Sequence, residues 1–210
     1  MKRPSQRAAN VAYYERNRAL EIDRVRVRQR RTVEFLRGLR ARPCADCHGT
    51  FAPHQMDFDH RDGSAKRFRL TAGRAMLRPT VVLSEEATKC DVVCANCHRL
   101  RTKGRHEARQ VRGAGASRYL ARKRQAWRAQ ARLLDEIRDR PCADCGCRFE
   151  PCAMDFDHRD PGSKVSAVTR MIGRAGTARI LDEVAKCDIV CANCHRLRTF
   201  ERRSADPVRE

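Results

Sequence analysis

The sequence predicts an α+β protein that consists of two tandem small zinc modules, each preceded by a basic α-helix. Three observations lead to this prediction: the chain repeats itself, it contains 12 cysteines, and its net charge is +20 over 210 residues. Only 41% of the residues are hydrophobic and 5% aromatic, so a large apolar core is not expected. Domains with so little core need metal ions, disulfides or oligomerisation to stay folded.

A tandem duplication organises the chain. Residues 42–62 match residues 140–160 at 15 of 21 positions, and residues 89–102 match residues 186–199 at 13 of 14. Self-similarity at a long period indicates a repeated structural unit. The predicted regions are a basic helical region at 1–41, a first module at 42–103, a linker at 104–117, a basic helix at 118–140, a second module at 141–201 and a tail at 202–210.

Apolar residues recur at helical spacing ahead of each copy. The two stripes are Ile22, Val25, Val33, Leu36 and Leu39, and Leu120, Trp127, Ala131, Leu134 and Ile137. Proline follows each stripe, at positions 43 and 141, and ends the predicted helix. The same helices are rich in Lys and Arg, which indicates either a solvated face or a surface that lies against phosphates. One further short helix is expected in LSEEATKC and one in ILDEVAKC.

Closely spaced cysteine pairs indicate metal ligands rather than disulfides in a reducing compartment. Two CxxC pairs per copy complete a tetrahedral Cys₄ site, so two structural Zn²⁺ ions are expected, with redox motifs or disulfides as the alternative. The predicted ligands are Cys44, Cys47, Cys94 and Cys97, and Cys142, Cys145, Cys191 and Cys194. Four cysteines remain, of which Cys90 and Cys187 are either small core residues or alternative ligands, whereas Cys147 and Cys152 occur in one copy only.

The sequence Asp-Phe-Asp-His occurs in each copy, and another His follows the last cysteine of each. Phosphodiester hydrolysis needs a base that activates water and a cation that stabilises the developing charge. Imidazole titrates near neutral pH and suits proton transfer, while a carboxylate with a second imidazole can bind a divalent ion. The candidates are Asp59, His60 and His98, repeated as Asp157, His158 and His195. A buried hydrogen-bonded cluster is the alternative interpretation.

The segments MDFDHRD and KCDVVCANCHRLRT together resemble the HNH endonucleases of the zinc-clamped, CxxC-containing type. The resemblance implies a ββα-metal unit similar to a treble clef, with one divalent ion per module. It implies Asp59, His98, Asp157 and His195 as metal ligands, and His60 and His158 as general bases. Lys89 and Lys186 replace the family's middle Asn. The nearest candidates, Asn96 and Asn193, either orient the catalytic His or shape the zinc knuckle.

Other polar residues flank these candidates. Asp57 and Asp155 lie two positions before Asp59 and Asp157, on the same strand face, so they either contact a metal ligand from behind or hold an arginine. Two arginines follow the last His of each copy. They are expected to contact phosphate or to form ordinary solvated surface: Arg99 and Arg101, and Arg196 and Arg198.

These observations predict a metal-dependent DNA endonuclease whose two modules cut both strands of double-stranded DNA. The strong positive charge supports a polyanionic substrate such as DNA. We expect Mg²⁺ as the catalytic ion, with Mn²⁺, Ni²⁺ or Zn²⁺ as alternatives. The chain is expected to act as a monomeric pseudo-dimer or weak homo-oligomer. With no apolar membrane span or signal peptide in the sequence, no membrane partner and a cytoplasmic, nucleoid-associated location are expected. The alternative is a non-catalytic zinc-stabilised protein that binds DNA or RNA.

Overall fold

The computed structural model describes residues 6–70, 77–110 and 118–205. Helices and two small two-stranded sheets form these parts of the chain, which confirms the α+β prediction. The residues cluster into two compact units, 1–43 with 58–92, and 44–57 with 93–210. The second unit contains the whole second repeat, so the complete arrangement of one repeat is seen there. None of the helices in the described ranges combines the length and apolar character needed to cross a bilayer.

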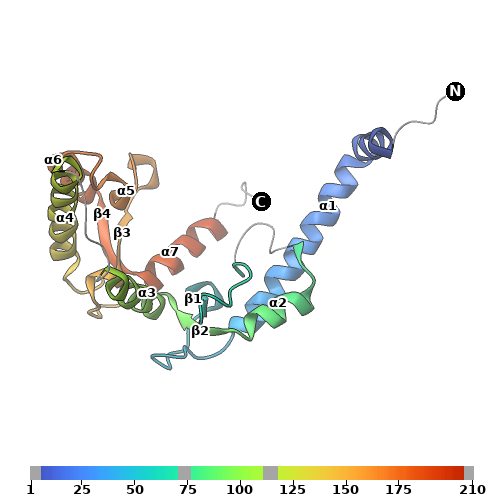
Figure 1. The fold of residues 1–210 in the computed structure, drawn as a ribbon, viewed down its shortest axis with the longest axis horizontal. Helices are drawn as coiled ribbons and strands as arrows, with labels where there is room; N and C mark the ends of the chain where they lie inside the picture. The colour runs from blue at the N-terminus through green and yellow to red at the C-terminus, as the bar shows by residue number, and fades with distance from the viewer. Residues whose placement is uncertain (1–5, 71–76, 111–117, 206–210) are drawn as a thin grey trace. The chain divides into compact units, whose positions relative to one another are not determined.

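The elements that the two repeats share follow one another in the same order, and η4 and α5 are described in the second repeat alone (Figure 1). The first repeat and its leading helix contain α1 (Gln6–Arg40), η1 (Pro53–Gln55), β1 (Met56–His60), α2 (Thr80–Ala87), β2 (Cys90–Cys94) and α3 (Ala95–Gln110). The second contains α4 (Arg118–Arg138), η3 (Pro151–Ala153), β3 (Met154–His158), η4 (Pro161–Ser163), α5 (Val168–Met171), α6 (Thr177–Val184), β4 (Cys187–Cys191) and α7 (Ala192–Ala205). The short helices expected in LSEEATKC and ILDEVAKC are α2 and α6.

The β3–β4 hairpin is antiparallel and places the candidate carboxylates on one face. Met154 lies opposite Cys191, and His158 lies opposite Cys187 at the other end of the pair. Because side chains alternate along a strand, Asp155 and Asp157 share one face of β3. Helix α7 begins directly after β4, so its first turn lies close to this pair of carboxylates.

The core of the second repeat lies between α4 and the short helices. Leu134 of α4 is fully buried against Val168, Met171 and Ile180, with Cys187 of β4 in the same cluster. A separate cluster around Met154, Ile189 and Val190 adjoins the cysteines. Each cluster is small, as expected from the low aromatic content.

A tight turn follows α5 in the second repeat. Gly173 has φ 71°, and a Cβ at this position would lie 2.9 Å from Cδ1 of Trp127. The left-handed conformation and the close approach of the indole both favour glycine there.

The predicted apolar stripes are only partly correct. Leu36 is buried in a cluster with Leu70, Leu83 and Cys90, but Val25 and Val33 are 39% and 38% exposed. Trp127 of α4 is likewise 50% exposed. The reason is that α2 and α6 are eight residues long, so they cover only the last turns of α1 and α4.

Two predicted boundaries are wrong. Residues 104–110, expected to begin the linker, continue α3, and residues 202–205, expected in the tail, continue α7. Arg, Glu and Ala favour helix, and the single Gly104 costs only about 1 kcal/mol, which does not end a helix. The rest of the predicted linker, 111–117, the rest of the tail, 206–210, and residues 1–5 and 71–76 lie outside the described residues.

Leu134→Ala should lower the free energy of unfolding by about 2–5 kcal/mol, because it empties the centre of a core cluster. The control is Leu181→Ala on α6, where the side chain is 39% exposed and truncation should change stability by less than about 1 kcal/mol. Urea denaturation followed by the fluorescence of Trp127, the single tryptophan, measures both. Equal losses for the two variants would contradict this description of the core.

Candidate functional site

Two groups of four cysteines are each gathered to hold a metal ion. The sulfur atoms of Cys44, Cys47, Cys94 and Cys97 all lie within 4.8 Å of one another, and so do those of Cys142, Cys145, Cys191 and Cys194. Sulfurs bound at 2.3 Å around a tetrahedral zinc ion are about 3.8 Å apart. The Cys47 and Cys94 sulfurs, 4.0 Å apart, fit that spacing. The predicted ligand sets are therefore brought together, consistent with two zinc sites.

Backbone N–H groups prepare one sulfur of each cluster to bind a cation. The N–H of Cys94 donates to Sγ of Cys44, and that of Cys191 donates to Sγ of Cys142, each at 3.2 Å. Burial alone would raise the pKa of these thiols, but the surrounding N–H donors lower the pKa of Cys44 and of Cys142 to about 7. A thiol that loses its proton near neutral pH is a ready metal ligand.

The other four cysteines do not join the clusters. Cys90 and Cys187 are each 8% exposed, and burial raises the pKa of each thiol to about 11, so they are neutral core residues. Cys147 is exposed and Cys152 half-buried. All twelve cysteines are free thiols.

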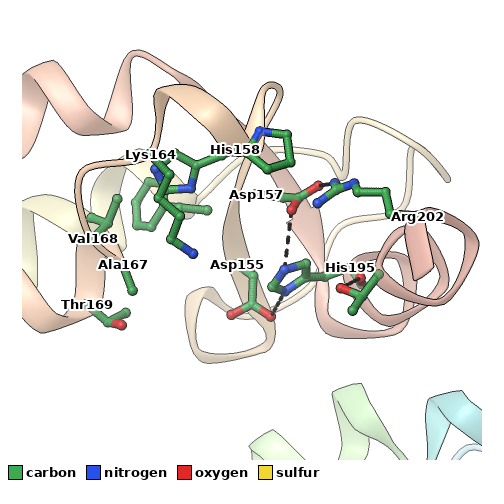
Figure 2. Close-up of a pocket in the computed structure, with 12 residues that line it drawn as sticks. Asp155, Asp157, His158, Lys164, Ala167, Val168, Thr169, His195 and Arg202 are labelled. Carbon is green, nitrogen blue, oxygen red and sulfur yellow. Dashed lines mark hydrogen bonds and ion pairs between the residues drawn. The ribbon is translucent and has the colours of Figure 1, made fainter. Parts of the chain in front are cut away.

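His195 lies between two carboxylates of β3 (Figure 2). Its Nδ1 is 3.0 Å from Oδ2 of Asp155, and its Nε2 is 3.4 Å from Oδ1 of Asp157. Hydrogen bonds with Asp155 and Asp157 raise the pKa of His195 to about 9, against the opposing effect of burial. The imidazole is therefore a cation at neutral pH when only protein groups surround it.

The Asp157–His195 pair has the spacing of two ligands of one divalent ion. Ligand atoms about 2.1 Å from an ion, separated by 90–110°, are roughly 3.0–3.4 Å apart. An ion that binds Nε2 must displace its proton, while Asp155 stays on Nδ1 and fixes the orientation of the ring. The pair offers one carboxylate and one imidazole, which suits Mg²⁺, Mn²⁺ or another first-row divalent ion.

Asp157 is also held by two arginines of α7. Its Oδ2 accepts a hydrogen bond from Nη1 of Arg198 at 3.0 Å and another from Nη2 of Arg202. These bonds leave Oδ1 directed at His195, as Figure 2 shows. Asp157 is 3% exposed, and although burial opposes it, His195 and the two guanidinium groups hold the pKa of its carboxyl well below the usual range.

His158 is buried against a carboxylate that the sequence interpretation missed. Its Nε2 lies 2.8 Å from Oε1 of Glu183, and the two side chains are 5% and 3% exposed. Glu183 also accepts from Lys186 Nζ at 2.8 Å and from the backbone N–H of Val165 at 2.8 Å. The ion pair with Lys186, opposed by burial and aided by His158, lowers the pKa of Glu183 to about 2. With Nε2 occupied by a carboxylate, Nδ1 is the nitrogen that remains to take a proton.

The Asp157–His195 pair and His158 line one cavity of about 260 Å³. Its walls include Asp157, His158 and His195, together with the cationic side chains of Lys164 and Arg202. The cavity therefore combines a candidate base, a candidate ion site and positive charge.

The first repeat shows the same contacts within each unit. In one unit Nδ1 of His98 lies 2.8 Å from Oδ2 of Asp57, and in the other Nε2 of His60 lies 2.8 Å from Oε1 of Glu86. Asp59 is buried, at 6% exposure. Asp57 and Asp155 thus contact the predicted metal-binding histidines from behind, and each also holds an arginine, so the two alternatives expected for them apply together.

Asn96 and Asn193 contact each other, which fits the second of the two alternatives expected for them, shaping of the cysteine knuckles. Oδ1 of Asn193 accepts the backbone N–H of Asn96 at 3.3 Å, and Oδ1 of Asn96 accepts that of Asn193 at 3.0 Å. Both residues are buried where the cysteine knuckles of the two repeats meet. The side chain of Asn96 also contacts Cys191. They shape the knuckles, because each is one position after the start of its helix and points at the other copy.

The four arginines predicted to contact nucleic acid make ion pairs within the chain. Arg101 binds Asp46 at 2.5 Å and Arg198 binds Asp144 at 2.5 Å, each within its own repeat. Arg99 binds Asp155 and Arg196 binds Asp57, each in the other repeat. Their guanidinium groups support acidic side chains of the site.

The alignment of the two repeats could have indicated the two glutamates that the sequence interpretation missed. Glu86 and Glu183 each stand four residues before the core cysteine of their copy, in helices that differ at most other positions. A carboxylate retained at the buried face of two divergent helices indicates a partner. Arg202 had a weaker signal: it aligns with Arg105, so each copy has an arginine seven residues after its last His.

Zinc content should follow the two cysteine clusters. Wild-type protein should bind two zinc ions per chain, and Cys142→Ser should bind one, because three thiolates and a serine hold zinc poorly. Cys147→Ser removes an exposed thiol five residues away and should still bind two. Elemental analysis of purified protein measures the ratio, and an unchanged ratio in Cys142→Ser would contradict the assignment.

Glu183→Gln should destabilise the fold by about 2 kcal/mol at pH 7, because the buried carboxylate accepts charged hydrogen bonds. Its folded pKa lies below the unfolded value, so this stabilisation is present above about pH 4.5 and is lost as pH falls toward 2. The wild-type advantage should therefore be constant near neutral pH and narrow below about pH 4.5. Urea titrations at several pH values test this, with the exposed Asp182→Asn as the control. An advantage that widens in acid would contradict it.

Comparison with known proteins finds no family model, no curated protein and no solved structure that matches this chain. The function is therefore inferred from the described side chains and from the motifs that they form.

Proposed function

We propose that the chain is a metal-dependent DNA endonuclease of the HNH type, with one ββα-metal site in each repeat. The observation that carries this proposal is the cavity of the second repeat. There a carboxylate and an imidazole at ligand spacing, Asp157 and His195, lie beside a buried imidazole, His158, held by Glu183. A purely structural zinc protein has no need for this second constellation next to its Cys₄ cluster.

His158 is the proposed general base. The carboxylate of Glu183 accepts a hydrogen bond from the Nε2–H of His158 and so fixes the tautomer, which leaves the Nδ1 lone pair to receive a proton from water. Burial of both side chains keeps the ring in one orientation, as a catalytic group requires. His60 and Glu86 form the same pair in the first repeat.

Asp157 and His195 are the proposed ligands of a divalent ion, for which Mg²⁺ is the first candidate. When bound, the ion supplies positive charge that stabilises the charge developing on the phosphate during hydrolysis. Asp155 holds His195 in the ligating orientation through Nδ1. Lys164 and Arg202 supply further positive charge at the cavity wall, where a phosphate group would enter.

The charge of the whole chain supports a nucleic-acid substrate. A net charge of +20 provides strong, salt-dependent attraction to a polyanion. Much of α1 is solvent-exposed and basic, and few of its residues are buried, so this helix is available for phosphate contacts. Two sites in one chain match the two strands of a duplex, and double-stranded DNA is accordingly the proposed substrate.

A second candidate function is non-catalytic binding of DNA or RNA by a zinc-stabilised protein. One observation favours it: Oδ2 of Asp157 is already bonded to Arg198 and Arg202, as in a structural ion-pair cluster. The retention of the buried His–Glu pair in each repeat favours the enzyme, because a structural module would tolerate its loss from one copy.

Wild-type protein with its zinc retained should convert supercoiled plasmid to linear DNA when Mg²⁺ is added, and should leave it intact when Mg²⁺ is withheld. His60→Ala and His158→Ala should each produce nicked circles, because one strand is still cut. The double variant should lose at least about 100-fold in rate, the usual contribution of a general base. Agarose gels resolve the three plasmid forms.

His106→Ala removes an exposed histidine of α3 and is the control, with a cleavage rate expected to equal that of wild type. Binding of DNA without cleavage under any of the four candidate divalent ions would sink the enzyme proposal in favour of the binding protein.

A further inference from the structure

The cysteine knuckles of the two repeats are joined by reciprocal contacts. Asn96 and Asn193 exchange hydrogen bonds between side chain and backbone, and Gln55 Nε2 donates to the carbonyl of Asn193 at 3.0 Å. Helix α3 contacts η3 of the other repeat, and α7 contacts η1 in return. The two knuckles, with η1, η3, α3 and α7 beside them, thus form a pseudo-symmetric pair within one compact unit, 44–57 with 93–210.

Arg99 connects this contact to the candidate site of the second repeat. Its Nη2 lies 2.9 Å from each carboxylate oxygen of Asp155, and its Nη1 donates to the carbonyl of Cys152 at 3.4 Å. The same Asp155 binds Nδ1 of His195. The Asp155 side chain is 15% exposed, so few other groups compete for it. Arg99, Asp155 and His195 also line one cavity of about 400 Å³.

The reverse contact is present as well. Nη2 of Arg196 lies 2.6 Å from Oδ2 of Asp57, and that oxygen also lies 2.8 Å from Nδ1 of His98. Arg99 belongs to the first repeat and Arg196 to the second, one position after His98 and His195. Each repeat therefore lends an arginine to the carboxylate behind the other repeat's histidine.

Building on the proposed nuclease function, we propose that Arg99 and Arg196 are positioning residues that act in trans: Arg99 orients His195 through Asp155, and Arg196 orients His98 through Asp57. Nη2 of the guanidinium contacts both oxygens of Asp155 while Nη1 contacts the carbonyl of Cys152, so Arg99 ties the carboxylate to the backbone beside it and limits its rotation. A carboxylate behind a metal-binding imidazole sets the orientation of the ring, and its loss commonly costs roughly 10- to 100-fold. The arginine contacts this carboxylate and not the imidazole itself, so its removal is expected to lower the cleavage rate less, by about threefold to tenfold.

If each arginine acts on the other repeat, its removal should slow cleavage mainly by the repeat that does not carry it. An arginine that simply contacts DNA would not show this crossed effect. In a His60→Ala background only the second repeat cuts, and there Arg99→Ala should lower the nicking rate about threefold to tenfold while Arg196→Ala should have the smaller effect. In a His158→Ala background the order should reverse. A phosphate contact would instead make each arginine matter most for the repeat that carries it.

Several controls separate positioning from folding and charge. Arg128→Ala removes the same charge from an exposed position of α4 and should change nicking equally in the two backgrounds. Arg99→Lys keeps the charge but has a single nitrogen, which cannot hold Asp155 and the Cys152 carbonyl as the two guanidinium nitrogens do, and should rescue only part of the loss. Zinc content and the urea midpoint should stay near the wild-type values, and the loss should appear in kcat rather than in the DNA dissociation constant.

Imidazole nitrogen resonances provide a readout that needs no cleavage. In ¹H–¹⁵N spectra of the zinc-loaded protein, Arg99→Ala should shift the nitrogens of His195 and leave those of His98, and Arg196→Ala should do the opposite. His195→Ala and His98→Ala assign the signals. Crossed shifts with no nicking by wild type would retain the coupling and reject the nuclease. Nicking with no crossed effect, or shifts confined to the repeat that carries the mutation, would overturn the coupling.

Discussion

The chain depends on the gathering of four sulfur atoms from two segments about 50 residues apart in each repeat. Apolar burial does not replace this constraint, because each described core cluster contains only four or five buried residues. Binding of structural zinc to such clusters contributes on the order of 10 kcal/mol to folding in small metal-binding peptides. In the second repeat, closing the cluster brings β3, which carries the Asp-Phe-Asp-His sequence, beside α7, which carries the last His. The zinc-binding residues therefore determine where the candidate catalytic residues lie.

The position of His195 shows how local this coupling is. It follows the ligand Cys194 directly and lies in the first turn of α7, which starts at the end of β4. The antiparallel register then sets Asp155 and Asp157 of β3 against that turn. A strand of five residues and one helical turn thus supply the proposed metal-binding pair with Asp155 behind it, while α6 adds Glu183. The low aromatic content, which limits the core, does not limit the chemistry.

Residues whose roles depend on short spacing could be predicted from the sequence. The cysteine ligands, the same-face aspartates and the position of the last His follow from local patterns of two to four residues. Glu86, Glu183 and the arginine pairs could not be placed in this way, because the histidine partners of the glutamates and the aspartate partners of the arginines lie 25 to 139 positions away and depend on tertiary packing. The role of Asn96 and Asn193 depended in the same way on the contact between repeats. Helix ends were missed where helix-favouring residues outweighed one glycine.

Charge in this protein has two distinct uses. On α1 few residues are buried, and its exposed basic residues make the electrostatic potential around the chain more positive. The arginines of α3 and α7 instead neutralise aspartates beside the knuckles, where an uncompensated buried carboxylate would cost several kcal/mol. Two of these ion pairs cross between the repeats, so duplication has done more than double the number of sites. Once a side chain from one copy stabilises a carboxylate of the other, neither copy can change that position alone, and this constraint fits the presence of the same Arg and the same Asp in both copies.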